Sequence, residues 1–157
     1  METGNLFVDA QTAFARQQRR RRRARVLRWL LRRPQDTVAL ASLQEALGAA
    51  PPSGRRAIGL TAIPLTSIVG TAESAKARAF DSDFRPSATS RRRWERLWIA
   101  GRRGAPLPPI SVFRLGEHHF VADGHHRVSV AHSLGMAAID AEVTDLGAEP
   151  RPYLIES

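Results

Sequence analysis

Residues 121–127, Val-Ala-Asp-Gly-His-His-Arg, decide the fold of this chain because they join a strand-like stretch to a helix-like stretch. The strand is expected over residues 118–122, and apolar side chains recur at helical spacing over residues 125–134. Amide groups in the first turn of a helix have no partner within the helix and attract anions. Two imidazoles and a guanidinium at the same place also donate hydrogen bonds to phosphate oxygens. We therefore predict a phosphate site at this junction.

Each residue of the junction, which we name the DGHHR segment (Asp123–Arg127), has a candidate role. Gly124 allows a ligand to approach the backbone closely, and the predicted phosphate ligands are Gly124, His125, His126 and Arg127. Asp123 leaves three alternatives open: it caps the helix, holds Mg²⁺ that bridges to phosphates, or accepts a proton from a substrate hydroxyl. In the catalytic alternative, Asp123 acts together with His125.

All five histidines of the chain lie between residues 118 and 132, which raises the alternative of a transition-metal centre. Zinc is disfavoured because His118 and His119 are neighbours on the expected strand and point to opposite faces of it. The chain also has no cysteine to serve as a metal ligand. A third alternative is structural, with histidines that only cap the helix and meet solvent.

The composition fits one compact domain with an extension, since the chain has 157 residues and is 43% hydrophobic. The absence of cysteine excludes disulfides and thiolate catalysis. Residues 1–14 lack the pattern of a signal peptide, and no apolar run is long enough to span a bilayer. We therefore expect a cytoplasmic protein without a transmembrane segment.

The net charge of +9 is concentrated near the N-terminus. Residues 1–56 hold twelve arginines and four acidic residues, which leaves only +1 for the remainder of the chain. A helix is expected over residues 14–33, ended by Pro34, with an apolar stripe at residues 26, 27, 30 and 31. Three alternatives stay open for it: docking on DNA phosphates, lying on anionic lipid, or packing on the main domain through its apolar stripe. The predicted contacts to non-specific DNA are Arg19, Arg20, Arg21, Arg22, Arg23, Arg25 and Arg28.

Periodicity and turn residues predict a small α+β domain of two layers behind this basic extension. The division expected is an Arg-rich arm and linker over residues 1–56, the domain over 57–148 and a tail over 149–157. In chain order, the further elements expected are a helix at 36–47, a strand at 58–69 interrupted by Pro64, a helix at 90–100 with Trp94, Leu97 and Trp98 inward, a hairpin of strands 109–115 and 118–122, and a strand at 139–143.

Residues 63–143 resemble the N-terminal domain of ParB chromosome-partitioning proteins, which share a fold with sulfiredoxin. The likeness includes an Ile-Pro-Leu opening, a Pro-Ile strand, a hairpin, a glycine-centred turn and an Ala-x-x-Leu-Gly helix end. At the turn, ParB proteins carry Gly-Glu-Arg-Arg and sulfiredoxins carry Gly-Cys-His-Arg. This chain has Gly-His-His-Arg over residues 124–127.

The resemblance implies a nucleotide, since this turn binds CTP in ParB and ATP in sulfiredoxin. It assigns phosphate contacts to Gly124, His126 and Arg127, whereas His125 replaces the sulfiredoxin cysteine and excludes sulfinic-acid repair. The function predicted is a stand-alone ParB-like domain that binds CTP, ATP or ADP and has non-specific DNA affinity. One alternative is a Mg²⁺-dependent phosphotransferase or nucleoside triphosphatase, because free serine kinases of this fold carry a similar Asp-Gly-His-x-Arg segment; Glu73 is then a second candidate carboxylate. Another is an interaction module without nucleotide, and whether the chain forms a homodimer stays open.

Overall fold

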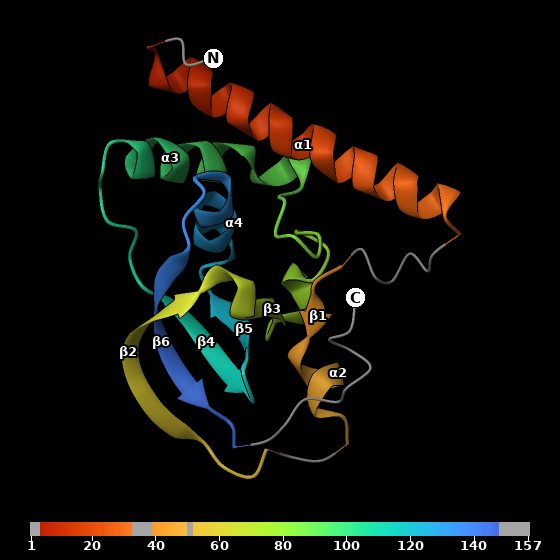
Figure 1. Cartoon of the computed structure of the whole chain (residues 1–157), viewed down its shortest axis with the longest axis vertical. Coiled ribbons are helices and arrows are strands. Elements are labelled where there is room, and N and C mark those ends of the chain that lie inside the picture. Colours follow the sequence, from red (N-terminus) through yellow and green to blue (C-terminus); the bar gives the residue numbers. More distant parts are fainter. Residues whose placement is uncertain (1–3, 33–38, 50–51, 148–157) are drawn as a thin grey trace.

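The structure, a computed structural model, describes residues 4–32, 39–49 and 52–147. Three helices are stacked above one end of a twisted sheet, and a fourth short helix lies beside the first strand (Figure 1). The helices are α1 (Leu6–Leu30), α2 (Leu43–Leu47), α3 (Arg91–Arg102) and α4 (His125–Ser133). The strands are β1 (Ala41–Ser42), β2 (Arg56–Pro64), β3 (Ile68–Thr71), β4 (Ile110–Leu115), β5 (His118–Asp123) and β6 (Ala138–Asp145).

The six strands form one mixed sheet in the order β1-β3-β5-β4-β6-β2. The hairpin expected around residues 116 and 117 is present, with β4 and β5 antiparallel. Parallel pairs join β1 to β3, β3 to β5 and β4 to β6, and β2 closes the other edge antiparallel to β6. The predicted α+β architecture with a helical N-terminal extension is therefore confirmed.

The single strand expected over residues 58–69 is wrong, because the chain turns at its middle. β2 ends at Pro64, and the turn Leu65–Ser67 carries the chain across to β3 near the opposite edge. The hydroxyl of Ser67 donates to the Pro64 carbonyl over 2.7 Å, and the Leu65 amide donates to the carbonyl of Ala137. Proline has no amide hydrogen to continue a ladder, so a strand end at this position has a clear cause.

The N-terminal elements also differ in extent from those expected. α1 begins at Leu6 rather than residue 14, because the side chain of Asn5 accepts a hydrogen bond from the Phe7 amide and caps the helix. Of the helix expected over 36–47, the structure describes residues 39–47, of which only α2 is helical, and β1 precedes it. Gly48 ends α2 as expected. Residues 33–38 and the tail at 149–157 lie outside the described part of the chain.

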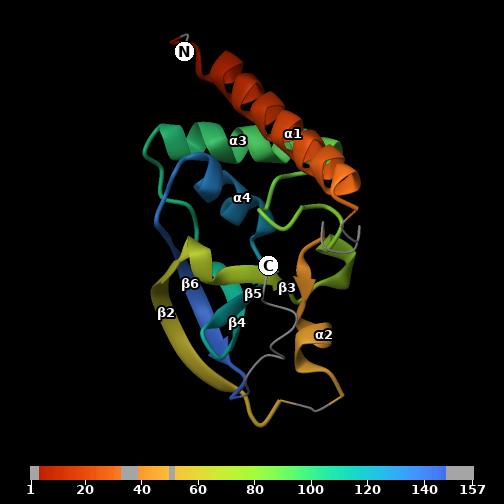
Figure 2. The ribbon, with the colours of Figure 1, turned by 45° about the vertical axis from the view of Figure 1, so that its right-hand side comes forward.

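From the sheet outward, the helices lie in the order α4, α3 and α1, and Trp94 lies at the centre of this stack. Val128 and Ala131 of α4 contact the apolar face of the sheet, and α3 packs against both α4 and α1. The buried indole of Trp94 donates to the hydroxyl of Ser129 on α4 over 2.9 Å. On its other side, Phe14 of α1 meets the Trp94 ring edge to face at 5.6 Å between centroids. Figure 2 shows the same order of helices after a turn of the view.

Described residues of α1, α2 and the stretch before β1 contribute to each of the three hydrophobic clusters. Leu40 packs in the main cluster with the sheet and α4, and Leu43 with Ala46 packs below β5. The face of α1 that packs on α3 carries Ala10, Ala13 and Phe14. The apolar stripe at residues 26, 27, 30 and 31, which one of the three alternatives placed against the main domain, is exposed. None of the helices in the described ranges is both long and apolar enough to cross a membrane.

Arg21, predicted to contact DNA, is a buried structural residue. Only 9% of its surface is exposed, and its guanidinium donates to the main-chain carbonyls of Arg78, Ala79 and Arg85 at 2.9, 3.1 and 3.3 Å. The prediction for this one arginine is therefore corrected. Since these carbonyls belong to the segment that follows β3, Arg21 ties α1 to the loop on which Phe80 and Phe84 are buried.

We expect the Arg21→Ala variant to lose roughly 2–4 kcal/mol of unfolding free energy, because three partly buried carbonyls lose a charged donor. The measurement is urea denaturation followed by circular dichroism. The matched control is Arg22→Ala, whose side chain is exposed on the same helix and should change stability by less than about 0.5 kcal/mol. Equal losses in both variants would contradict a structural role for Arg21.

Candidate phosphate-binding site

The DGHHR segment forms the junction between β5 and α4, and Gly124 makes this junction possible. Its φ of 105° lies in the left-handed region that side chains disfavour. A Cβ at this position would also come within 2.5 Å of the Ile110 side chain. The first turn of α4 is thereby held close to the start of β4, and no side chain caps it. The expected capping role of Asp123 is therefore not seen.

Asp123 and Arg127 instead form an ion pair across the first turn of α4. The two side chains meet at 2.6 Å, with 72% of the aspartate and 14% of the arginine side chain exposed. The same guanidinium donates to the carbonyl of Pro108 over 3.0 Å and to that of Pro109. Arg127 is thus held in place by its neighbours, and its predicted phosphate contact would compete with Asp123.

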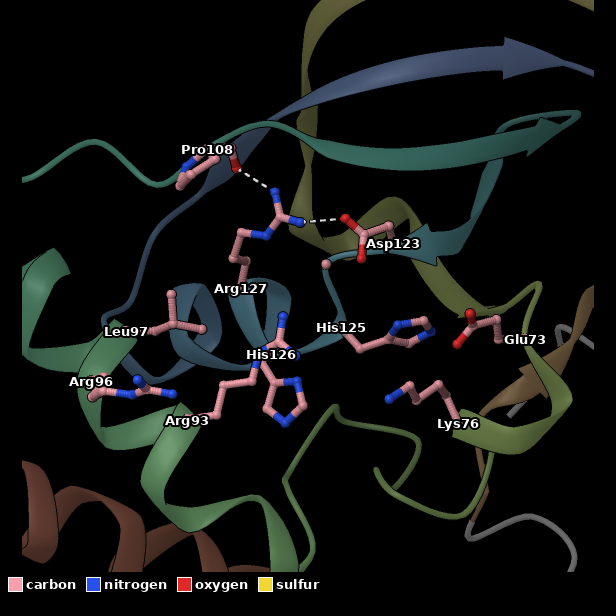
Figure 3. A pocket seen from close by; sticks show the side chains of 11 residues that line it. Glu73, Lys76, Arg93, Arg96, Leu97, Pro108, Asp123, His125, His126 and Arg127 are labelled. Carbon is pink, nitrogen blue, oxygen red and sulfur yellow. Dashed lines mark hydrogen bonds and ion pairs between the residues drawn. The ribbon is translucent and has the colours of Figure 1, made fainter.

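A pocket of about 620 Å³ opens in front of this helix start (Figure 3). Side chains from four separate segments surround it: the turn after β3, helix α3, the stretch before β4 and the DGHHR segment. The lining residues are Glu73, Lys76, Arg93, Arg96, Leu97, Pro108, Asp123, Gly124, His125, His126 and Arg127.

Three cations of this pocket form no ion pair with the part of the chain that the structure describes. Lys76, Arg93 and Arg96 have no ion-pair partner within residues 4–32, 39–49 and 52–147. The carboxylate of Asp123 is paired with Arg127, which leaves the carboxylate of Glu73 as the other acid of the lining. The pocket therefore has an excess of positive charge beside the start of a helix that no side chain caps.

The imidazole of His125 points away from solvent and connects α4 to β3. It is 3% exposed, its Nε2 atom lies 2.7 Å from the hydroxyl of Thr71, and its ring stacks on Phe80 at 5.9 Å. Burial first, and then the positive charge of Lys76, lowers its pKa to about 4. His125 thus stays neutral at pH 7, and its side chain serves to position the first turn of α4.

His126 faces the pocket from the next position of the helix. Its ring meets Phe80 edge-on at 5.1 Å between centroids, and Lys76 and Arg93 reach toward it from either side (Figure 3). Burial first, and then the charges of Arg93 and Lys76, lowers its pKa to about 4. In the neutral form one ring nitrogen can donate a hydrogen bond to an anion without adding charge.

The other three histidines lie apart from this pocket. His119 is buried with its Nδ1 atom 2.8 Å from the hydroxyl of Ser67, and His132 stacks on Phe84 near the end of α4. His118 begins β5, at the end opposite to Asp123. In the part of the chain that the structure describes, no three histidine, aspartate or glutamate side chains group as metal ligands.

Sequence reasoning missed Lys76, Arg93 and Arg96, which contribute most of the free positive charge. A signal for Arg93 and Arg96 was present, because both belong to an arginine-rich helix whose inward face includes Trp94. Lys76 is the single lysine of the chain but stands in an irregular stretch without periodicity. Only the folded chain shows which of these cations face the DGHHR segment.

Comparison with known proteins gives little beyond this geometry. No family model matches the sequence, and a search of curated proteins returned no match. Among solved structures, the chain is similar to a sulfiredoxin from Arabidopsis thaliana, at 18% sequence identity and a TM-score of 0.40. The similarity covers 54% of this chain and 82% of that one.

We expect the stability of the protein to fall as the pH is lowered from about 6.5 to 4. The pKa of His125 is about 4 in the fold and near 6.5 when unfolded, so the unfolded chain binds the extra proton within this window. The contribution is on the order of 3 kcal/mol, complete above pH 6.5 and lost near pH 4. Urea unfolding across this range measures it. His125→Gln should weaken the dependence, of which His126 with its similarly lowered pKa retains a share, whereas His118→Gln, a matched exchange outside the pocket, should leave it unchanged. Equal profiles for His125→Gln and the parent would refute the assignment.

Proposed function

We propose that this protein binds a phosphate-bearing ligand, with a nucleotide as the first candidate, in the pocket before α4. One observation carries the proposal: Lys76, Arg93 and Arg96, brought from separate elements, surround an uncapped helix start and form no ion pair with any described residue. Charge that is left unpaired around a concave site costs stability unless an anion balances it, so the arrangement suits a ligand with several negative oxygens.

The pocket offers two kinds of donor to such a ligand. The amides of His125 and His126 in the first turn of α4 supply fixed partial charges. Arg93 and Arg96 on α3, and Lys76 opposite, supply full charges on longer side chains. A diphosphate or triphosphate can meet both kinds at once, whereas a single phosphate group uses only one. Leu97 and Pro108 add an apolar wall that suits a base or sugar.

Calorimetric titration with ATP, ADP and CTP, with and without Mg²⁺, tests the proposal. We expect binding of at least one nucleotide, and a loss of roughly tenfold or more in affinity for Lys76→Ala and for Arg93→Ala, because each removes a charged donor. The control is Arg114→Ala, since Arg114 pairs with Asp145 near the far end of β4 and should leave affinity unchanged. Absence of binding to all three nucleotides, or equal losses in the control, would refute the pocket assignment.

The enzymatic alternative is a phosphotransferase or nucleoside triphosphatase in which Asp123 acts as base or Mg²⁺ ligand. Its support is the exposed carboxylate of Asp123 beside the pocket. The same carboxylate repels phosphate in a simple binding site and holds the guanidinium of Arg127 away from a ligand.

The Asp123→Asn variant therefore separates the two functions. For a binding site we expect nucleotide affinity to rise several-fold, because a like charge is removed and Arg127 is released from its ion pair. For an enzyme, any phosphate release by the parent would be abolished in the variant. Affinity is measured by calorimetry and turnover by phosphate release. A lower affinity with no turnover in the parent protein would contradict both.

The DNA affinity predicted for α1 concerns a different surface. Arg19, Arg20, Arg22, Arg23 and Arg25 are exposed, while Arg21 is buried. The DNA contacts of the exposed arginines stay a prediction from charge. Exposed apolar residues lie beside these arginines on the same helix.

A further inference from the structure

We propose that the outer face of the second half of α1 docks on an anionic lipid surface. The face consists of the exposed arginines already named and of an apolar end formed by Val26, Leu27, Trp29, Leu30 and Leu31. Each of these five side chains is more than half exposed, and Trp29 is 69% exposed. The proposal is independent of the phosphate pocket.

The position of this face follows from how α1 packs. The buried residues of the helix are Ala10, Ala13, Phe14 and Arg21, and no residue of α1 after Arg21 is buried. Figure 1 shows this last part of the helix running on past α3. The apolar end therefore has no cover from the described part of the domain.

Cations and apolar side chains lie along one line of the helix surface. Arg19, Arg23, Val26 and Leu30 follow at spacings of four, three and four residues, which places them on one side of an α-helix. Along this row, arginines are followed by apolar residues within about three turns of the helix. A tilted helix can insert such an apolar end among acyl chains while its arginines remain at the level of the headgroup phosphates.

A membrane satisfies both parts of this face, whereas the other candidates satisfy one. DNA phosphates would pair with the arginines, but a duplex would leave most of the five apolar side chains in water. A second copy of the helix would cover apolar surface but offers no counter-charge, because residues 16–32 contain no acidic residue. Large exposed aromatic and aliphatic side chains beside arginines are typical of the membrane interface.

The helix would carry the whole domain to the surface. Phe14 packs on Trp94, and Arg21 binds the loop carbonyls, so α1 is attached to the body rather than tethered by a linker. Docking by the last turns would therefore hold the domain in a fixed orientation on the membrane surface.

Tryptophan fluorescence of the full chain provides the test. Trp29 is open to solvent, whereas Trp94 and Trp98 are buried, so a blue shift on adding vesicles reports Trp29. We expect the shift, and co-sedimentation, with vesicles containing phosphatidylglycerol and neither with pure phosphatidylcholine. The double variant Leu27→Ser/Leu30→Ser should bind at least roughly tenfold more weakly, because two apolar side chains no longer insert.

The matched control changes two exposed apolar residues at the other end of the same helix, Phe7→Ser and Val8→Ser, and should bind as the parent does. Circular dichroism checks that both double variants remain folded. No shift with anionic vesicles, or equal binding by the leucine variant, overturns the proposal. So does a DNA duplex that binds while vesicles do not, or a parent dimer in light scattering that the leucine variant dissociates.

Discussion

The close approach of Gly124 to Ile110 is the constraint on which the site depends. A residue without a side chain allows β5 to turn directly into α4 at a positive φ, and it allows the start of the helix to lie against the start of β4. From this placement follow the contacts of Arg127 with the carbonyls of Pro108 and Pro109. The uncapped first turn of α4 then opens into the pocket rather than into the core.

The electrostatic character of the pocket depends on which of its charged side chains form ion pairs and which do not. Asp123 and Arg127 cancel each other, and burial keeps the histidines of the segment uncharged at pH 7. The excess charge therefore comes from Lys76, Arg93 and Arg96, which the DGHHR segment does not contain. The segment supplies backbone donors and shape, and other elements supply charge, so neither part alone makes an anion site.

The two parts of helix α1, up to Arg21 and after it, lie in different surroundings. The part up to Arg21 belongs to the core, through Phe14 against Trp94 and through Arg21 on the loop carbonyls. The part after Arg21 has no buried residue and presents arginines beside exposed leucines and a tryptophan. Since α3 lies between α1 and the pocket and supplies Arg93 and Arg96, the part of α1 up to Arg21 also supports one wall of the site.

The elements with clear periodicity and turn residues could be predicted from local sequence. The hairpin of β4 and β5, the helix α3 with its inward Trp94, the start of α4 after Gly124 and the α+β class all followed from local patterns, because alternation, helical spacing and glycine act over a few positions. Long-range partners could not be predicted in this way. The tertiary structure turned the chain at Pro64, placed β1 in the sheet, buried Arg21, exposed the stripe at residues 26–31 and brought Lys76 opposite Arg93. A linear pattern shows that a side chain is apolar or charged, but whether it meets protein, solvent or another charge depends on segments distant in the chain.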